Sequence, residues 1–292
     1  MKDVGVDATR RYRLLLACPD EPGIIYRVSG ALTARACNIV AFDQHSEGVA
    51  GGYYFMRAEF DAPIPFDTQG FEAQLAELLP QEGSSWRLRA QAQRHRLGIL
   101  VSRESHCLEE LAWQVERQDI DAEIKVVISN HARLESIASR FRLPFYVVPV
   151  SPETKAAAES QMLDILRRYE VDTVVLARYM QILTERFIAA YPRQIINIHH
   201  SFLPAFVGAN PYQQAYDRGV KLIGATAHYV TSELDAGPII EQDVHRVDHR
   251  HQVEDFKRIG RYVERMVLAR AVRWHVEDRV LPHGNRTIVF PI

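Results

Sequence analysis

The sequence of 292 residues predicts an α/β protein built from two domains, a small one over residues 9–92 and a larger one over residues 95–292. Two observations support this fold class. Apolar runs of strand length alternate along the chain with stretches whose apolar residues recur at helical spacing. The polar, basic stretch at residues 91–96 interrupts this alternation, and a new apolar strand follows it directly, which indicates a domain boundary.

The small domain reads as strand, helix, strand, strand, helix, strand. Its strands are predicted at residues 12–18, 38–46, 51–60 and 86–91, and its helices at residues 23–36 and 71–79. Asp20 and Pro22 stand where the start of the first helix favours them. We expect Asn38 to adopt the left-handed conformation that ends this helix, and the glycine-rich stretch 48–52 to link the two middle strands.

The larger domain begins as a series of strand and helix units. Its strands are predicted at residues 97–102, 123–129, 145–150, 171–177 and 194–200, with helices at residues 107–116 and 132–141. A further helix is expected to open at Ser151, Pro152 and Glu153, because a serine cap followed by proline is typical of a first turn, and a short helix at Thr184. Such units predict a Rossmann-like, mostly parallel sheet covered on both faces, with ligands at the carboxyl ends of its strands.

The pattern changes after residue 219. Two longer strands are predicted at residues 221–231 and 237–247, and the loop SELDAG separates them. The amphipathic stretch at residues 252–278 carries its apolar residues on one stripe, and we expect it to form a helix that covers the sheet.

Composition and charge limit the partners that the chain can bind. The 35 lysines and arginines balance 37 aspartates and glutamates, and a net charge of −2 creates no field for nucleic acid or anionic lipid. The three cysteines, Cys18, Cys37 and Cys107, form no CxxC pair, which is typical of free thiols in a reducing compartment. No secretion signal and no apolar segment of bilayer length is recognised. We therefore expect a soluble, cytoplasmic protein whose partners are small molecules.

A polar pair at the end of a predicted strand is the first indication of chemistry. Asn197 and His199 alternate with two isoleucines, so strand geometry places both polar side chains on the same face. An asparagine amide can donate to a developing oxyanion and a histidine can transfer a proton, as acyl transfer requires. Asp235, in the SELDAG loop, is the candidate carboxylate to hold the protonated histidine. The residues alone also allow another interpretation, in which Asn197 and His199 are hydrogen-bonded polar groups at a strand end and Asp235 only forms a turn.

Three separated motifs resemble those of the formyltetrahydrofolate-dependent transformylase and hydrolase superfamily. They are LARYMQILT from residue 176, NIHHSFLP from residue 197 and GATAHYVTSELDAGPII from residue 224, and the resemblance covers residues 97–292. In that family an Asn-x-His pair and a later aspartate form the catalytic set, which here implies Asn197, His199 and Asp235. The resemblance also implies that the folate contacts Met180, Gln181, Ile182, Leu183, Val230 and Glu233.

The resemblance leaves two formyl acceptors open, water and an amine. Transformylases of glycinamide ribonucleotide carry a glycine-rich loop after the first strand, whose amides cradle the substrate's phosphate. Here the segment 101–108 reads VSRESHCL, without the small glycines that let a backbone approach a phosphate. This segment, and His200 in place of a proline, resemble the formyltetrahydrofolate deformylases. The resemblance thus implies a site wall that includes Ser102, His106, His200 and His228.

Other nucleophiles and potential ligands are interpreted as structural. Cys107 opens a helix without a base motif nearby, so we interpret it as a buried thiol rather than a nucleophile. His245, His249 and His251 lack a repeated ligand spacing and are expected to be exposed to solvent. The role of His228 stays open, since it can be structural or can support the site. No metal or other cofactor is expected, because the reduced folate is the substrate.

The N-terminal segment at residues 18–40 resembles an ACT domain, in its D-x-P-G opening and in the asparagine before the second strand. The resemblance implies a ferredoxin-like βαββαβ fold, and such domains commonly pair edge to edge and bind small amino acids between subunits. Asp20, Gly23 and Asn38 are thereby implied as an effector site, and a homo-oligomer is expected. A dimerisation module without a ligand stays open as the alternative.

These features together predict hydrolysis of 10-formyltetrahydrofolate to tetrahydrofolate and formate, within one-carbon and purine metabolism. The first alternative is formyl transfer to an amine such as glycinamide ribonucleotide, and a formate assay without amine distinguishes the two. The second alternative, of another class, is a catalytically idle, amino-acid-sensing ACT protein, which the intact Asn-x-His pair and Asp235 disfavour.

Overall fold

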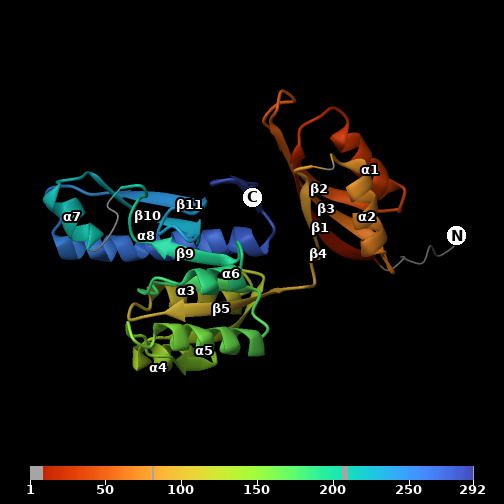
Figure 1. Cartoon of the computed structure of the whole chain (residues 1–292). Coiled ribbons are helices and arrows are strands. Elements are labelled where there is room, and N and C mark those ends of the chain that lie inside the picture. Colours follow the sequence, from red (N-terminus) through yellow and green to blue (C-terminus); the bar gives the residue numbers. More distant parts are fainter. Residues whose placement is uncertain (1–8, 81, 206–209, 292) are drawn as a thin grey trace, which may run out of the picture. The chain divides into compact units, whose positions relative to one another are not determined.

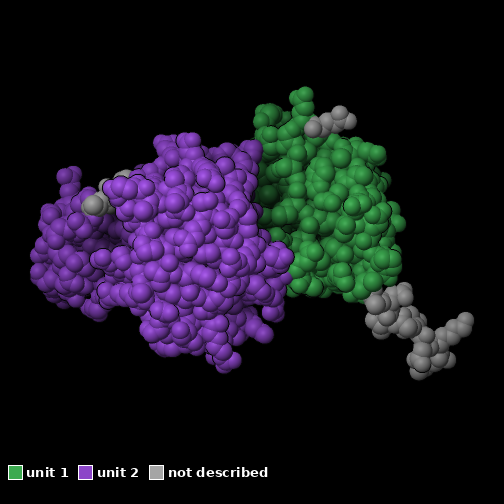
Figure 2. Space-filling view, turned by 60° about the horizontal axis from the view of Figure 1, so that its bottom comes forward, with its two compact units in different colours: residues 1–93, 278–281, 288–292 green, residues 94–277, 282–287 purple. Residues whose placement is uncertain are grey.

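The computed structural model describes residues 9–80, 82–205 and 210–291 of the chain. The chain divides into two compact units (Figure 2), with residues 1–93, 278–281 and 288–292 in the first and residues 94–277 and 282–287 in the second. The boundary after residue 93 falls within the predicted linker. The end of the chain differs from the predicted larger domain, because residues 278–281 and 288–292 group with the first unit.

The first unit has the predicted βαββαβ order, which confirms the ferredoxin-like fold class. Its elements are β1 (Thr9–Pro19), α1 (Ile24–Thr33), β2 (Asn38–Ser46), β3 (Tyr53–Pro63), α2 (Thr68–Leu78) and β4 (Ser85–Ala90). The four strands form an antiparallel sheet in the order β2-β3-β1-β4, and α1 and α2 lie together on one face of it (Figure 1).

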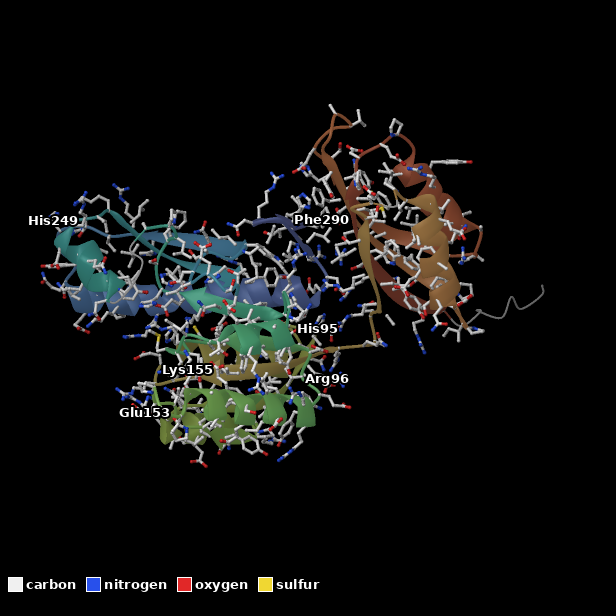
Figure 3. The ribbon with its side chains drawn as sticks, viewed as in Figure 1. His95, Arg96, Glu153, Lys155, His249 and Phe290 are labelled. Atoms are coloured by element: carbon white, nitrogen blue, oxygen red, sulfur yellow. The ribbon has the colours of Figure 1, made fainter. Side chains whose placement is uncertain are left out.

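β1 is buried on both faces of this sheet. Leu14 and Leu16 belong to the cluster beneath α1 and α2, whereas Leu15 and Ala17 belong to a cluster on the other face. Phe290 (Figure 3) is part of that second cluster, so residues from the end of the chain cover the face opposite the helices. Burial on both sides explains why β1 reads as an unbroken apolar run instead of an alternating one.

The first helix ends earlier than the sequence predicts. α1 stops at Thr33, and Ala36 takes the left-handed conformation that was predicted for Asn38, with a φ of 56°. The amide of Cys37 bonds back to the carbonyl of Leu32, which closes the helix end. Asn38 is then extended and opens β2, so its predicted role as a left-handed stop was wrong.

The second unit contains a seven-stranded sheet of mostly parallel strands, as predicted. The strands are β5 (His95–Val101), β6 (Ala122–Ser129), β7 (Phe145–Val147), β8 (Thr173–Leu176), β9 (Ile195–His199), β10 (Leu222–Tyr229) and β11 (Ile239–Arg246), in the order β11-β10-β9-β8-β5-β6-β7. β5 to β9 are parallel, β10 pairs antiparallel with β9, and β11 pairs antiparallel with β10. Strand order reverses between β5 and β8, and such a switch point is where ligands of open α/β sheets bind.

Helices cover both faces of this sheet. They are α3 (His106–Glu116), a short η1 (Ala132–Leu134) that continues into α4 (Glu135–Arg140), α5 (Lys155–Arg168), α6 (Glu185–Ala190), α7 (Pro211–Asp217) and α8 (Val253–Val276). α5 packs Met162 and Leu166 onto Leu100 of β5, while α3 and α8 contact each other on the other side of β5 (Figure 1). In the part of the chain that the structure describes, no helix is both long enough and apolar enough to span a membrane.

Three details of the larger domain depart from the predicted elements. The helix expected to open at Ser151 begins at Lys155, because Ser151 and Thr154 bond to each other in a preceding turn; Glu153 and Lys155 mark this start in Figure 3. α7 was not predicted. A two-stranded sheet of β12 (Val280–His283) and β13 (Arg286–Val289) was also missed, since its strands are only four residues long.

Candidate active site

Two strands bring three polar side chains to one place at the carboxyl end of the sheet. Asn197 and His199 lie on the same face of β9. Asn197 pairs with the last residue of β8, and His199 lies beyond the end of that strand. β9 also pairs with β10, in a register that sets His228 opposite Asn197. His228 therefore lies beside the predicted pair because of cross-strand pairing, which sequence spacing does not reveal.

The loop between β10 and β11 brings Asp235 to this cluster. A Cβ atom on Gly237 would lie 1.8 Å from the carbonyl oxygen of Tyr229, so only glycine lets the loop fold back this closely. The amide of Tyr229 bonds to the carbonyl of Pro238 at 2.9 Å, which closes the loop. Asp235 itself has a φ of 55°, a left-handed conformation that is uncommon for aspartate and is frequent at functional sites.

Asp235 forms the centre of a charged cluster. Its Oδ2 lies 3.3 Å from Nδ1 of His199, and its Oδ1 lies 3.7 Å from Nε2 of His228. The hydrogen bond from His199, and then the one from His228, hold the pKa of the Asp235 carboxyl well below its usual value. His199 is only 6% exposed, and its second ring nitrogen, Nε2, has no hydrogen-bond partner among the described residues. The hydrogen-bonding capacity of this buried nitrogen is therefore unused among the described residues.

Asn197 is held by His228. Its Nδ2 lies 3.2 Å from His228 Nε2, and His228 Nδ1 lies 2.9 Å from the carbonyl oxygen of Tyr229. The same ring nitrogen of His228 thus lies near both Asn197 and Asp235. Asn197 also lines the cavity described next, where its side-chain amide can donate to a ligand.

A cavity of about 320 Å³ opens directly onto this cluster. Asn197, His199 and Asp235 all line it. So do all six of the predicted folate contacts, namely Met180, Gln181, Ile182, Leu183, Val230 and Glu233. Met180, Ile182 and Leu234 are each more than half exposed, so the cavity has an apolar wall next to its polar end. This combination is typical of a small-molecule site.

Only two of the four predicted wall residues line this cavity. His200 and His228 do. Ser102 instead lies behind the wall, where its Oγ accepts the Met180 amide at 3.0 Å and donates to Asn130. His106 points to Glu264 of α8, with its Nε2 2.8 Å from the carboxylate. Ser102 and His106 therefore do not line this cavity, because both side chains are engaged by neighbouring elements.

Sequence reasoning missed Arg178 and Glu264. Arg178 lines the catalytic cavity, and its Nε lies 3.3 Å from the carboxylate of Glu264. Tyr212 of α7 donates its hydroxyl to the same carboxylate. Burial opposes ionisation of Glu264, but the hydrogen bond from His106 and the charge of Arg178 outweigh it and lower the pKa. Glu264 follows Gly260 at helical spacing on the buried face of α8, which is the signal that could have revealed it.

His106, Cys107 and Glu264 are the one group of potential metal ligands found among the described residues. Their ligand atoms lie within 4.8 Å of one another. The Glu264 carboxylate already has three partners, and burial holds the pKa of the Cys107 thiol well above its usual value. A protonated thiol is a poor metal ligand, and the charge of this carboxylate is already compensated by its partners. The group is therefore better described as an internal ion pair than as a metal site. Cys107 is fully buried, in agreement with its interpretation as a structural thiol.

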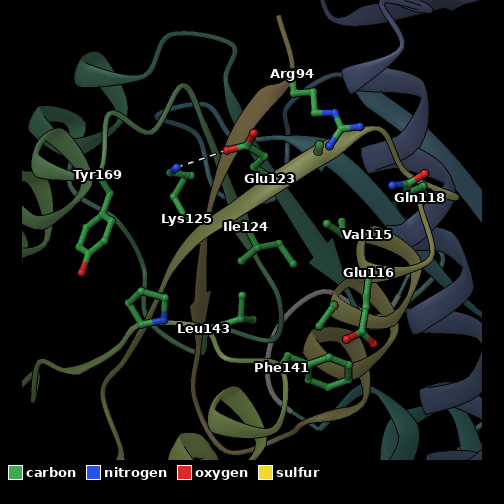
Figure 4. A pocket seen from close by; sticks show the side chains of 13 residues that line it. Arg94, Val115, Glu116, Gln118, Glu123, Ile124, Lys125, Phe141, Leu143 and Tyr169 are labelled. Carbon is green, nitrogen blue, oxygen red and sulfur yellow. Dashed lines mark hydrogen bonds and ion pairs between the residues drawn. The ribbon is translucent and has the colours of Figure 1, made fainter. Parts of the chain in front are cut away.

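A larger cavity, of about 580 Å³, lies at the amino end of β6 (Figure 4). Two of its four charged residues, Glu123 and Lys125, pair with each other, and Phe141 and Leu143 form an apolar side. It lies at the opposite end of the parallel strands from Asn197, and the groups that line it do not form a catalytic set.

The three histidines after β10 do not gather into a site. His245 and His249 are exposed, as predicted, and His249 is visible on the surface in Figure 3. His251 is only half-exposed, since its Nδ1 lies 3.0 Å from Asp248, so the prediction of an exposed side chain was wrong for this residue.

The predicted effector residues are not brought together within one chain. Asp20 and Gly23 lie in the connection between β1 and α1, where Asp20 bonds to Ser46 at the far end of β2. Asn38 opens β2, eight residues from Ser46, which is roughly 26 Å along an extended strand. The three residues therefore do not form a single site inside this unit.

Comparison with known proteins agrees with this architecture. The model of the formyl transferase family matches residues 95–272, and the model of the ACT domain matches residues 12–67. The chain is thus a formyl transferase-type protein that carries an N-terminal ACT domain.

The formyltetrahydrofolate deformylase of Bacillus subtilis is 51% identical over 95% of this chain and 93% of that protein, and the Escherichia coli K12 enzyme of the same name is 46% identical over 96% and 98%. A formyltetrahydrofolate deformylase structure from Pseudomonas syringae superposes with a TM-score of 0.92, at 48% identity over 98% of this chain and 96% of that one. A glycinamide ribonucleotide transformylase from Symbiobacterium toebii reaches a TM-score of 0.65, at 31% identity over 70% of this chain and 98% of that one. The chain belongs to the formyltetrahydrofolate deformylase family.

Proposed function

We propose that this chain hydrolyses 10-formyltetrahydrofolate to tetrahydrofolate and formate. The observation that carries the proposal is His199, which lines the cavity together with Asn197, has its Nδ1 facing Asp235 and has an Nε2 without a hydrogen-bond partner among the described residues. The similarity to proteins named formyltetrahydrofolate deformylase, over nearly the whole chain, supports the same reaction.

In this proposal the folate occupies the cavity of about 320 Å³, with its ring against the segment 180–183 and the residues Val230 and Glu233. Backbone groups of such segments can bond to the polar edge of a pterin ring, and the apolar side chains exclude water from its faces. The formyl group then lies at the polar end, next to Asn197 and His199.

The reaction proceeds by general base catalysis. Asp235 stays ionised and holds His199 through Nδ1, so Nε2 can take a proton from water. The water oxygen bonds to the formyl carbon, and Asn197 donates a hydrogen bond to the oxyanion that forms. When the carbon–nitrogen bond breaks, His199 gives its proton to the folate nitrogen. The second proton of the water is lost as formic acid ionises to formate.

Three further properties belong to this proposal. The folate is the substrate, and the acid–base and oxyanion groups supply the chemistry without a metal or another cofactor. A cytoplasmic location is favoured by the free cysteines. The ACT domain suggests a small-molecule effector, for which we propose an amino acid, and a homo-oligomer in which residues of two chains complete the site, because Asn38 is distant from Asp20 within one chain.

An assay without amine tests the proposed reaction. We expect formate and tetrahydrofolate to form in equal amounts from 10-formyltetrahydrofolate and water alone. A formylated amine that forms when glycinamide ribonucleotide is present, with no formate when it is absent, would instead indicate an amine acceptor. If neither product forms, the chain does not catalyse this chemistry.

A further inference from the structure

A second cavity, of about 470 Å³, adjoins the catalytic cavity. Arg178 and His200 line both cavities, so these two side chains form the partition between them. We call the second cavity the side chamber and define it by six of its lining residues, Arg178, His200, Tyr212, Lys257, Arg261 and Glu264. The proposed hydrolysis does not use the side chamber.

Arg178 has an unsatisfied guanidinium. Its side chain is 13% exposed, and its Nη1 is buried without a hydrogen-bond partner among the described residues. Its backbone φ of 62° is left-handed, a conformation that costs an arginine more than a glycine. A long cationic side chain thus occupies an unfavourable backbone position, with a donor that has no acceptor among the described residues, which indicates a ligand with acceptor oxygens.

The charges of the side chamber favour an anion. Glu264 balances Arg178, but Lys257 and Arg261 add two more positive charges, against Glu104 as the other acidic residue of the lining. Arg261 has no ion pair among the described residues, and Lys257 bonds to Glu254. Burial, and then the charge of Arg178, lower the pKa of His200 to about 3, so its ring is neutral at physiological pH. The lining therefore keeps an excess of one positive charge.

His200 lies between the candidate catalytic group and this chamber. The rings of His199 and His200 lie 5.4 Å apart, and those of His200 and Tyr212 lie 5.9 Å apart. The side chain of His200 therefore separates His199 from Tyr212 of the side chamber. The folate, in contrast, is expected in the other cavity, along the segment 180–183.

We propose that the side chamber binds formate, the small carboxylate released by hydrolysis, on the guanidinium of Arg178. This inference rests on the proposed function for the identity of the ligand. Formate presents two coplanar oxygens, which match the planar array of guanidinium donors. Formate can then leave the catalytic centre while tetrahydrofolate is still bound, because the two products occupy separate cavities.

Direct titration of formate tests the proposal without any turnover. The resonance of ¹³C-labelled formate is followed at neutral pH while the full-length protein is added, in the absence of folate. We expect line broadening that saturates, and an affinity that falls about tenfold or more in Arg178→Gln, because a charge-assisted hydrogen bond is lost. Arg261→Gln should weaken binding about two- to fivefold, as for an exposed charge. Arg258→Gln, on the same helix but paired with Asp255, is the matched control and should bind formate as the parent does.

Each outcome decides the proposal. Unchanged formate binding in a folded Arg178→Gln variant overturns it, as does binding that is lost in Asn197→Ala and kept in Arg178→Gln, since formate would then occupy the catalytic cavity. If Arg178→Gln does not fold, the exposed Arg261→Gln variant is used in its place, and unchanged formate binding in that variant overturns the proposal. Inorganic phosphate is the competing anion, and displacement of formate by a much lower concentration of phosphate would indicate a phosphate site instead. A protein that binds formate but does not hydrolyse the folate separates this proposal from the proposed function.

Discussion

Two histidine–carboxylate pairs lie close to Arg178 and differ in what surrounds them. His199 and Asp235 are 3.3 Å apart at the edge of a cavity, whereas His106 and Glu264 are 2.8 Å apart in the interior. Both carboxyl groups have a lowered pKa. A short distance and a lowered pKa are therefore insufficient to identify a catalytic pair.

The difference lies in position and in the remaining hydrogen-bonding capacity. His199 borders a cavity at the carboxyl end of β9, next to an amide donor, and its Nε2 is unpartnered. His106 lines neither of the two adjoining cavities. The Glu264 carboxylate that it contacts also accepts a hydrogen bond from Tyr212 and forms an ion pair with Arg178. The first pair can act on a ligand, and the second stabilises the interior.

Replacing the histidine of the catalytic pair should have the largest effect. In His199→Ala, formate release should fall about a hundred- to ten-thousandfold, because the imidazole nitrogen that takes the proton from water is lost. The turnover number for amine-free hydrolysis is measured under saturating folate. His245→Ala removes an exposed histidine and serves as the control, with unchanged turnover expected. Equal turnover in His199→Ala and the parent would remove the distinction between the two pairs.

Replacing Glu264 of the interior pair should lower the stability of the protein more than its turnover number. Glu264→Gln leaves the positive charge of Arg178 without compensation in a buried place, so the free energy of unfolding should fall by about 3–5 kcal/mol. Formate turnover of the folded fraction should stay within about tenfold of the parent. Urea denaturation measures the stability, and Glu254→Gln, an exposed residue of the same helix, is the matched control. A stable Glu264→Gln variant as inactive as His199→Ala would contradict this account.

The effect expected for His200, which separates the two cavities, is confined to acidic pH. Burial, then Arg178, lower the pKa of its folded state to about 3, from an ordinary value of 6.5. On acidification the unfolded chain therefore binds a proton at His200 before the folded chain does. The stability that the neutral His200 ring contributes is complete above about pH 6.5 and is lost as the pH falls toward 3. His200→Gln should lose less stability than the parent over this window. Denaturation midpoints measured against pH give the result, and His249→Gln, an exposed position, should follow the parent.

The placement of the three candidate catalytic residues could be predicted because they lie in local patterns. Alternation in β9 places Asn197 and His199 on one face, and the motif around Asp235 supplies the third group. The contact of His228 with Asn197 depends on the register of two strands that are 31 residues apart, which local spacing does not determine.

The side chamber was missed because its residues come from distant segments. Arg178 follows β8 and Glu264 lies on α8, and neither residue type is unusual at its position when the sequence is read alone. Asn38 shows the opposite error, since its type fits a helix stop but the chain turns two residues earlier, at Ala36. Packing decides such alternatives, and local propensity does not.

Formate release by Asn197→Ala tests the central claim most directly. Asn197 is assigned to the oxyanion and not to folate binding, so its loss should lower the turnover number of amine-free hydrolysis about a hundred- to a thousandfold. The KM for 10-formyltetrahydrofolate should change little, because the hydrogen bond forms mainly in the transition state. A variant that releases formate at the parent's rate would contradict the assignment of this site.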